Sequence, residues 1–208
     1  MPAAMVARPR DARGYPVLAI TPWRDGSPDL AVTSPARILV CAVERRCSVC
    51  GLTLGRGPVW RVVAADEAAA IAQDPTGFEN AIATVEPPGH RLCMLYAAVV
   101  CPWLARPNAR RRFDADVVAS HLSRGDRRGA VGELGGAVVA FEQYEFTVGD
   151  RVEFRYRGLV EFLPHLLGEE HLAELRDGTA ADDASYEPGP PWLLADEEAA
   201  QVRAQRYR

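Results

Sequence analysis

The sequence predicts a protein of mixed α+β class, and two patterns lead to that prediction. Apolar residues recur at steps of three and four between Leu92 and Trp103, which is typical of a helix with one buried face. Apolar and polar residues alternate over 137–157 around the turn Val148-Gly149-Asp150, which is typical of a β-hairpin. With 208 residues and 48% hydrophobic composition, the chain is long enough to bury a core of its own.

Two short pairs of metal-ligand residues give the fold class a finer form. Cys47 and Cys50 form a CxxC motif closed by Gly51, and His90 and Cys93 stand three positions apart at the expected start of a helix. Zinc prefers thiolate and imidazole ligands in a tetrahedron, and a helix N-terminus favours a thiolate. A knuckle, a hairpin and a helix in this order predict a treble-clef-like zinc module, with Cys47, Cys50, His90 and Cys93 as the ligands of Zn²⁺.

The other two cysteines are not expected to bind the same ion. Cys101 lies eight residues beyond Cys93, about 12 Å along a helix, which is too far for one tetrahedron. Cys41 falls inside the preceding predicted helix, where the role of a small buried apolar residue fits it. A redox-active CxxC and an iron–sulfur cluster are the alternatives. A redox motif should open a helix after a strand, and a cluster favours four cysteines.

Turn and capping signals predict the elements before the second ligand pair. In chain order they are a flexible arm (1–14), two strands around a turn (15–20 and 29–33), a helix (34–46), a hairpin (52–54 with 59–63) and an Ala-rich helix (66–73). Ser34 can cap the first helix, and Pro35 fits its first position. The 39 residues between Cys50 and His90 exceed the needs of the hairpin, so we expect an insertion around 64–86.

The elements after that pair are predicted in the same way. They are the helix that ends before Pro102, a basic linker (106–112), a helix (114–123), a glycine-rich turn (132–136), the β-hairpin (137–146 with 151–157), a helical stretch (159–176), an acidic segment (177–191) and a terminal helix (193–206). The expected domain organisation has four parts: the flexible arm (1–14), the zinc-binding module (15–112), an α+β C-terminal region (113–176), and an acidic linker with the terminal helix (177–208).

Charge and hydropathy narrow the class of protein. The formal net charge is -4, which argues against a globally basic nucleic-acid binder. All 24 positive charges are arginine, and a local cluster of them offers candidate phosphate contacts at Arg106, Arg110, Arg111 and Arg112. No apolar run reaches the roughly 18 residues of a membrane-spanning helix. Five cysteines, two of them in a CxxC, fit a reducing compartment, so we expect a cytoplasmic protein without membrane contact.

Four sequence motifs resemble a family of proteins from actinobacteria and their phages. They are Arg13-Gly14-Tyr15-Pro16; Arg46-Cys47-Ser48-Val49-Cys50-Gly51 with Leu54-Gly55; Glu86-Pro87-Pro88-Gly89-His90-Arg91-Leu92-Cys93; and Cys101-Pro102-Trp103-Leu104. The resemblance covers about residues 13–112, with a weaker echo at 137–157. It implies the zinc site and implies no activity, because that family has none assigned. The chain departs from those proteins at 64–85, which is longer here.

The ligand set favours a structural zinc site, because a catalytic zinc keeps one position for water. We therefore expect a zinc-stabilised binding or regulatory protein whose partner is a protein or a nucleic acid. Two alternatives stay open. One is a small biosynthetic or hydrolytic enzyme that has a structural zinc site and binds a small molecule. The other is a nucleic-acid-binding zinc-finger protein.

No catalytic residue can be assigned from the sequence. A treble-clef nuclease of the His-Me type needs a general-base histidine in its hairpin, and residues 59–63 contain none. His121, His165 and His171 lack the spacing of a metal or catalytic motif. The aromatic residues of the 137–157 hairpin could stack on bases, but alternating aromatics more often mark the core face of a sheet.

Overall fold

The computed structural model describes residues 1–63, 65–74, 83–100, 136–164 and 197–208. Within these ranges the chain has a mixed α+β fold with two antiparallel sheets, so the predicted class is confirmed at that level. The larger sheet has the strand order β3 (Val59–Val63), β4 (Ala137–Val148), β5 (Val152–Pro164), and the smaller sheet pairs β1 (Trp23–Arg24) with β2 (Ser27–Pro28).

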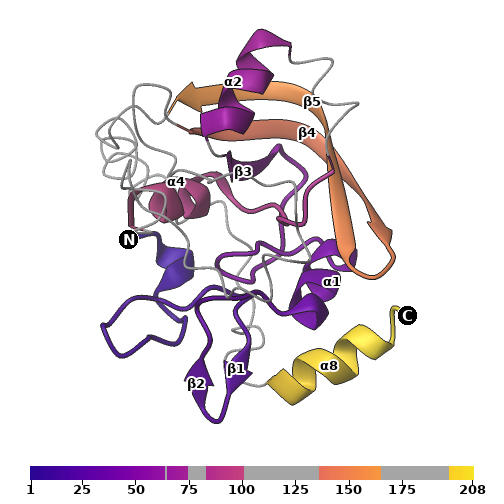
Figure 1. The fold of residues 1–208 in the computed structure, drawn as a ribbon. Helices are drawn as coiled ribbons and strands as arrows, with labels where there is room; N and C mark the ends of the chain where they lie inside the picture. The colour runs from indigo at the N-terminus through magenta and orange to yellow at the C-terminus, as the bar shows by residue number, and fades with distance from the viewer. Residues whose placement is uncertain (64, 75–82, 101–135, 165–196) are drawn as a thin grey trace.

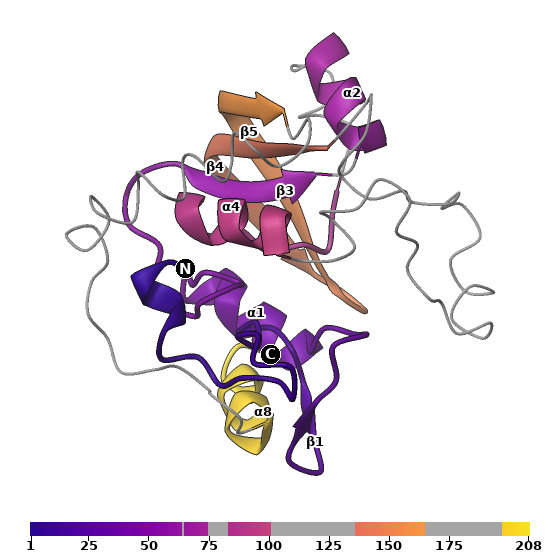
Figure 2. The ribbon, with the colours of Figure 1, turned by 90° about the vertical axis from the view of Figure 1, so that its left-hand side faces the viewer.

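Helix α4 (Arg91–Val100) lies between the two halves of the molecule. It packs against β3 and β4. Figures 1 and 2 show it between the larger sheet and the half that holds α1 (Pro35–Val43), α8 (Glu197–Gln205) and the β1–β2 pair. Leu92 and Leu95 on α4 are buried, as the apolar stripe predicted. Helix α2 (Ala65–Gln73) confirms the predicted helix at 66–73.

Strands β4 and β5 form the predicted hairpin, in which more and less buried residues alternate near the turn, over 144–147 and 152–156, whereas 137–141 are all buried. Tyr144 faces Tyr156 across the pair on the buried side, and Glu145 faces Arg155 on the exposed side. The sequence predicts a helix from residue 159, which is wrong for 159–164, because these residues extend β5 and pair with 137–141 of β4. A short apolar run fits a strand as well as a helix, and here the partner strand decides. The rest of that predicted helix lies outside the described residues.

Strand β3 pairs with β4 and not with residues 52–54, so the predicted hairpin of 52–54 with 59–63 is wrong. Val59 stands opposite Phe141 and Val63 opposite Ala137, whereas Thr53 forms an isolated bridge with Arg46. The exposed loop 55–58 leads the chain away from residues 52–54. Four of the five residues of β3 are buried, and such a strand needs apolar neighbours of the kind that β4 supplies.

The N-terminal region also differs from the prediction. Asp25 and Gly26 have φ values of 48° and 75°, as a tight two-residue turn requires, so the short strands β1 and β2 flank this dipeptide directly. The predicted strands 15–20 and 29–33 are therefore wrong. Residues 15–20 instead lie along the CxxC motif, where the Ala19 N–H donates to the Val49 carbonyl at 3.0 Å.

Some residues of the predicted arm, 1–14, are buried against the core. A single 3-10 turn, Ala3–Met5, places the fully buried Met5 in the core cluster. The buried Arg8 donates from Nε to the Val17 carbonyl at 2.9 Å. The burial of Met5 and Arg8 could not be predicted from the local sequence, because it depends on the distant residues that these side chains contact.

Helix α1 begins as the sequence predicts. The Ser34 Oγ accepts from the Arg37 N–H at 3.3 Å, and Pro35 occupies the first turn. The helix ends at Val43 and not at Arg46, because Arg45 takes a left-handed conformation with φ 50° and reverses the chain. Arg46 therefore lies outside the helix.

Helix α8 docks on α1 through charged groups. The Glu197 carboxylate accepts from the Ser34 Oγ at 2.6 Å and from the Arg37 Nε at 2.7 Å. At the other end, Arg203 and the Tyr207 hydroxyl both donate to the Glu44 carboxylate. The structure thus confirms a terminal helix within the predicted range 193–206, of which 193–196 lie outside the described residues.

Other predictions fall wholly or mostly outside the described residues: the linker 106–112, the helix 114–123, the turn 132–136 and the acidic segment 177–191. The boundaries of the four predicted parts stay a prediction, although β3 of the zinc-binding module and β4 of the C-terminal region share one sheet. Each helix in the ranges given above is too short or too polar to cross a lipid bilayer.

Replacing Ser34 with alanine should destabilise the fold. The substitution removes both the cap of α1 and a hydrogen bond to α8, so we expect a loss of about 1–2 kcal/mol in the free energy of unfolding. Denaturant unfolding of the full chain measures it. Ser27→Ala is the matched control at an exposed position and should change stability by less than about 0.5 kcal/mol. Equal effects of the two substitutions would contradict this role of Ser34.

Candidate metal centre

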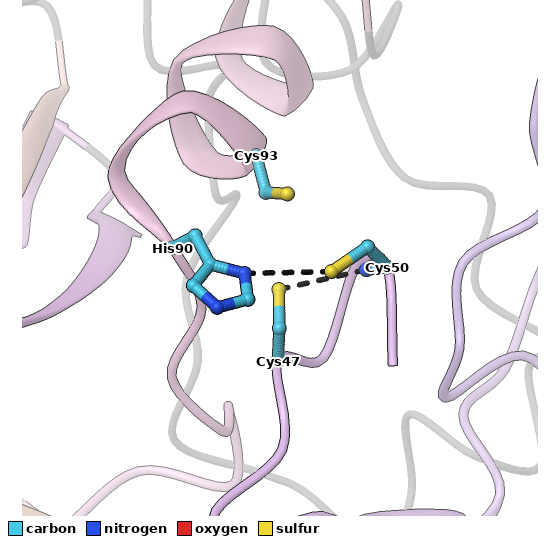
Figure 3. A group of neighbouring side chains, drawn as sticks. All are labelled: Cys47, Cys50, His90 and Cys93. Atoms are coloured by element: carbon cyan, nitrogen blue, oxygen red, sulfur yellow. Dashed lines mark hydrogen bonds between the residues drawn. The ribbon is translucent and has the colours of Figure 1, made fainter. Parts of the chain in front are cut away.

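The first half of the site is a tight turn formed by residues 47–51, called the knuckle below. The Cys47 N–H donates to the Leu52 carbonyl at 2.8 Å, and the Gly51 N–H donates to the Cys47 carbonyl at 2.9 Å. Gly51 has a φ of 83°, a left-handed conformation that glycine adopts without strain. The turn brings the Cys47 and Cys50 thiols to the same side of the backbone (Figure 3).

The second half follows a short extended segment, residues 84–89, called the strap below. His90 comes directly after the strap, and Cys93 lies in the first turn of α4. The Met94 N–H donates to the His90 carbonyl at 3.0 Å, which closes that first turn. The Ser48 N–H of the knuckle donates to the Pro88 carbonyl of the strap at 2.9 Å, so the two halves are joined through their backbones.

The structure brings the four predicted ligands together. One ligand atom from each of Cys47, Cys50, His90 and Cys93 lies within 4.8 Å of all the others (Figure 3). The Cys50 Sγ lies 3.4 Å from the His90 Nδ1. In a tetrahedral zinc site with bonds of about 2.0–2.3 Å, neighbouring ligand atoms are about 3.3–3.8 Å apart. The three cysteines are buried and His90 is partly buried, so the group can hold a metal ion.

A backbone carbonyl orients the histidine. The His90 Nε2 lies 3.1 Å from the Thr53 carbonyl oxygen. Because a carbonyl only accepts, Nε2 carries the proton in this arrangement, and Nδ1 presents its lone pair to the three sulfurs. The sequence has no signal for this contact, since any residue at position 53 would offer the same carbonyl.

Further support for the knuckle comes from Arg46. Its guanidinium donates from Nη1 to the Gly51 carbonyl at 3.1 Å, and the Glu44 carboxylate holds the same guanidinium at 2.7 Å from Nε. Glu44 is the residue that α8 also binds. Arg46 belongs to the quoted sequence motifs, but its role in bracing the turn could not be read from them.

The three thiols shift one another's pKa values. Burial opposes ionisation of Cys47, but hydrogen bonds from Cys50 and Cys93 and the nearby His90 hold the pKa of Cys47 well below its ordinary value. The hydrogen bonds to Cys47 raise the pKa of both Cys50 and Cys93, and burial adds to the rise. One thiolate is therefore stabilised by two thiols. A divalent cation supplies the charge that lets all three ionise.

The remaining predicted site residues divide into those that the structure describes and those that it does not. Cys41 is fully buried in α1 outside the four-residue cluster, and burial raises the pKa of its thiol, so the predicted apolar role is confirmed. Cys101, the candidate phosphate contacts Arg106, Arg110, Arg111 and Arg112, and the histidines His121, His165 and His171 lie outside the described residues.

The aromatic residues of the β4–β5 hairpin belong to the core. Phe141, Tyr144, Phe154 and Tyr156 are buried and pack as tilted ring pairs with centroids 5.1–6.3 Å apart. Tyr144 donates its hydroxyl to the Ala42 carbonyl of α1 at 2.9 Å. These rings are therefore not available to stack on bases.

Comparison of the chain with protein-family models, with curated proteins and with solved structures found no match. The resemblance to actinobacterial and phage proteins therefore stays a proposal. The metal centre rests on its own geometry.

Metal binding should release protons, because the pKa values of Cys50 and Cys93 are raised and these thiols must ionise to bind the ion. The apparent affinity should accordingly rise with pH. Titration calorimetry in buffers of different ionisation enthalpy counts the released protons. Binding that releases no protons, or an affinity that does not change with pH, would contradict this arrangement of charge.

Gly89→Ala should weaken metal binding about tenfold. A Cβ at position 89 would lie 2.3 Å from the Met94 Cε and 3.1 Å from the Cys47 Sγ. The flexible end of Met94 can move, so displacement of the ligand sulfur decides the effect. Competition with a chromophoric zinc chelator measures the affinity. Gly57→Ala, where a Cβ meets open space, is the control, and equal affinities of the two variants would contradict the prediction.

Proposed function

We propose that the chain is a zinc-stabilised binding or regulatory protein, in which a closed Cys₃His zinc site holds the fold and the surface performs the function. The observation that supports this proposal is the convergence of Cys47, Cys50, His90 and Cys93 from two distant segments into one buried group. Four protein ligands complete the tetrahedron and leave no position for a reactive water. The knuckle and the following helix α4 are the parts of a treble-clef-like module that support that finer assignment.

The donor set favours zinc among the biological metals. Three thiolates and one imidazole are soft to intermediate ligands, which suit Zn²⁺ and do not suit Mg²⁺ or Ca²⁺. An iron–sulfur cluster favours four cysteines. A dithiol redox role needs an accessible thiolate, whereas Cys47, Cys50 and Cys93 are each at most 2% exposed. Zn²⁺ is therefore the proposed cofactor.

A protein partner is the proposed target. Several arginines on the described surface are engaged by carboxylates, as in Arg13 with Asp11, Arg24 with Asp29, and Arg151 with Glu153. Such pairing reduces the positive potential that attracts nucleic-acid phosphates. The arginine cluster at 106–112 is the competing feature, and a gel shift with single- and double-stranded nucleic acid over a salt series tests it. Binding that weakens steeply with salt would replace the protein partner with a nucleic acid.

Loss of one ligand should remove the metal and destabilise the protein. We expect Cys50→Ser to abolish stoichiometric zinc and to destabilise the full chain by about 3–5 kcal/mol, a modest share of what structural zinc contributes. A loss of this size lowers the Tm by roughly 10 °C. Elemental analysis and thermal melting with and without a chelator measure both. Cys41→Ala, a buried cysteine outside the cluster, should keep its zinc. Wild-type protein that contains no zinc, or that melts unchanged after chelation, would contradict the proposed function.

A further inference from the structure

The strap is fastened to both outer strands of the larger sheet. At one end, Thr84 exchanges two backbone hydrogen bonds with Phe154 of β5, at 2.7 and 2.9 Å. At the other end, Gly89 exchanges two with Trp60 of β3, at 2.8 and 3.0 Å. Since β4 lies between β3 and β5, the strap links two strands that do not pair with each other. His90 and Cys93, the second half of the metal centre, follow from its end.

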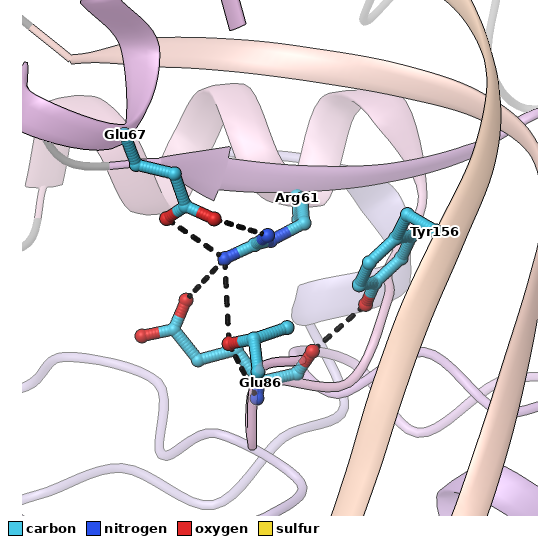
Figure 4. Close-up of polar contacts among 5 residues, drawn as sticks. Arg61, Glu67, Glu86 and Tyr156 are labelled. Atoms are coloured by element: carbon cyan, nitrogen blue, oxygen red, sulfur yellow. Dashed lines mark hydrogen bonds and ion pairs between the residues drawn. The ribbon is translucent and has the colours of Figure 1, made fainter. Parts of the chain in front are cut away.

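A buried arginine holds the middle of the strap. The Arg61 side chain on β3 is 3% exposed, and its Nη atoms donate to Glu67 of α2 at 2.6 and 3.1 Å and to Glu86 of the strap at 3.1 Å (Figure 4). Burial alone would lower the pKa of Arg61, and the fields of Glu67 and Glu86 raise it above its ordinary value. The guanidinium therefore stays charged and requires its carboxylates.

The same residue of the strap is held a second time through its backbone. The buried Tyr156 hydroxyl donates to the Glu86 carbonyl at 2.7 Å (Figure 4). The Arg61 guanidinium lies over the Tyr156 ring, with Cζ 5.1 Å from the ring centroid. Arg61 also reaches the Thr84 hydroxyl at 3.5 Å. Side chain and carbonyl of Glu86 are thus both fixed to the sheet, four residues before the ligand His90.

We propose that Arg61, Glu86 and Tyr156 are positioning residues for the metal centre, which hold the strap so that His90 and Cys93 meet the knuckle in ligand geometry. This inference rests on the proposed function. It goes beyond it by naming residues outside the ligand set that determine metal affinity. A preplaced half-site reduces the ordering that metal binding would otherwise have to accomplish, and outer residues of this kind commonly change metal affinity by about 10–100-fold.

The two carboxylates on Arg61 provide a matched test. Glu67 belongs to α2 and Glu86 to the strap, yet both bind the same guanidinium. Glu67 is the more buried of the two, at 17% against 46% side-chain exposure. Glu67→Ala should therefore lower the Tm at least as much as Glu86→Ala. If metal affinity followed stability alone, Glu67→Ala would also weaken zinc binding at least as much.

We expect the opposite ranking for metal affinity, measured on the full chain by competition with a chromophoric zinc chelator. Glu86→Ala should weaken zinc binding at least about tenfold and Glu67→Ala less than about threefold. Glu86→Gln, which keeps an acceptor for Arg61, should recover part of the loss and serves if the alanine variant does not fold. Equal affinities in both alanine variants, or losses that follow the loss of Tm, would overturn the proposal. Wild-type protein that binds no zinc would instead overturn the proposed function.

Discussion

The structure depends on the meeting of the knuckle and the strap around four soft ligand atoms. Three buried sulfurs cannot all ionise beside one another without a cation. Their atoms lie within 4.8 Å of one another, which is close enough to bind one ion together. Segments from much of the N-terminal half gather here: residues 15–20 lie along the knuckle, and α4 starts from the site. Structural zinc contributes about 10–16 kcal/mol in small domains, as much as the whole stability of a typical fold.

Buried cations assemble the rest of the molecule around this centre. Arg37 and Glu197 join α1 to the C-terminal helix, and Arg61 joins β3 to α2 and the strap. Each pair links residues that are far apart in sequence or belong to different elements. Buried ion pairs add little net stability over apolar packing, but a buried charge without its partner is strongly unfavourable. Such pairs therefore favour one arrangement of the chain over others.

What could be predicted from sequence was local. The ligands follow from side-chain chemistry and spacing, and the β4–β5 hairpin follows from alternation around a short turn. The partner of β3 could not be predicted, because Val59 pairs with Phe141, 82 positions away, and spacing carries no information about such contacts. Nor could the burial of Arg61 be predicted, since an arginine between Trp60 and Val62 is expected to be exposed until its carboxylate partners are placed. The support of His90 by the Thr53 carbonyl comes from backbone alone.

X-ray absorption at the zinc edge of the gently purified full chain tests the central claim most directly, because it reports the kind and number of atoms bound to the ion. The predicted spectrum is that of three sulfur atoms at about 2.3 Å and one nitrogen atom at about 2.0 Å. Oxygen ligands, a coordination shell with fewer than three sulfurs, or protein without stoichiometric zinc would contradict it.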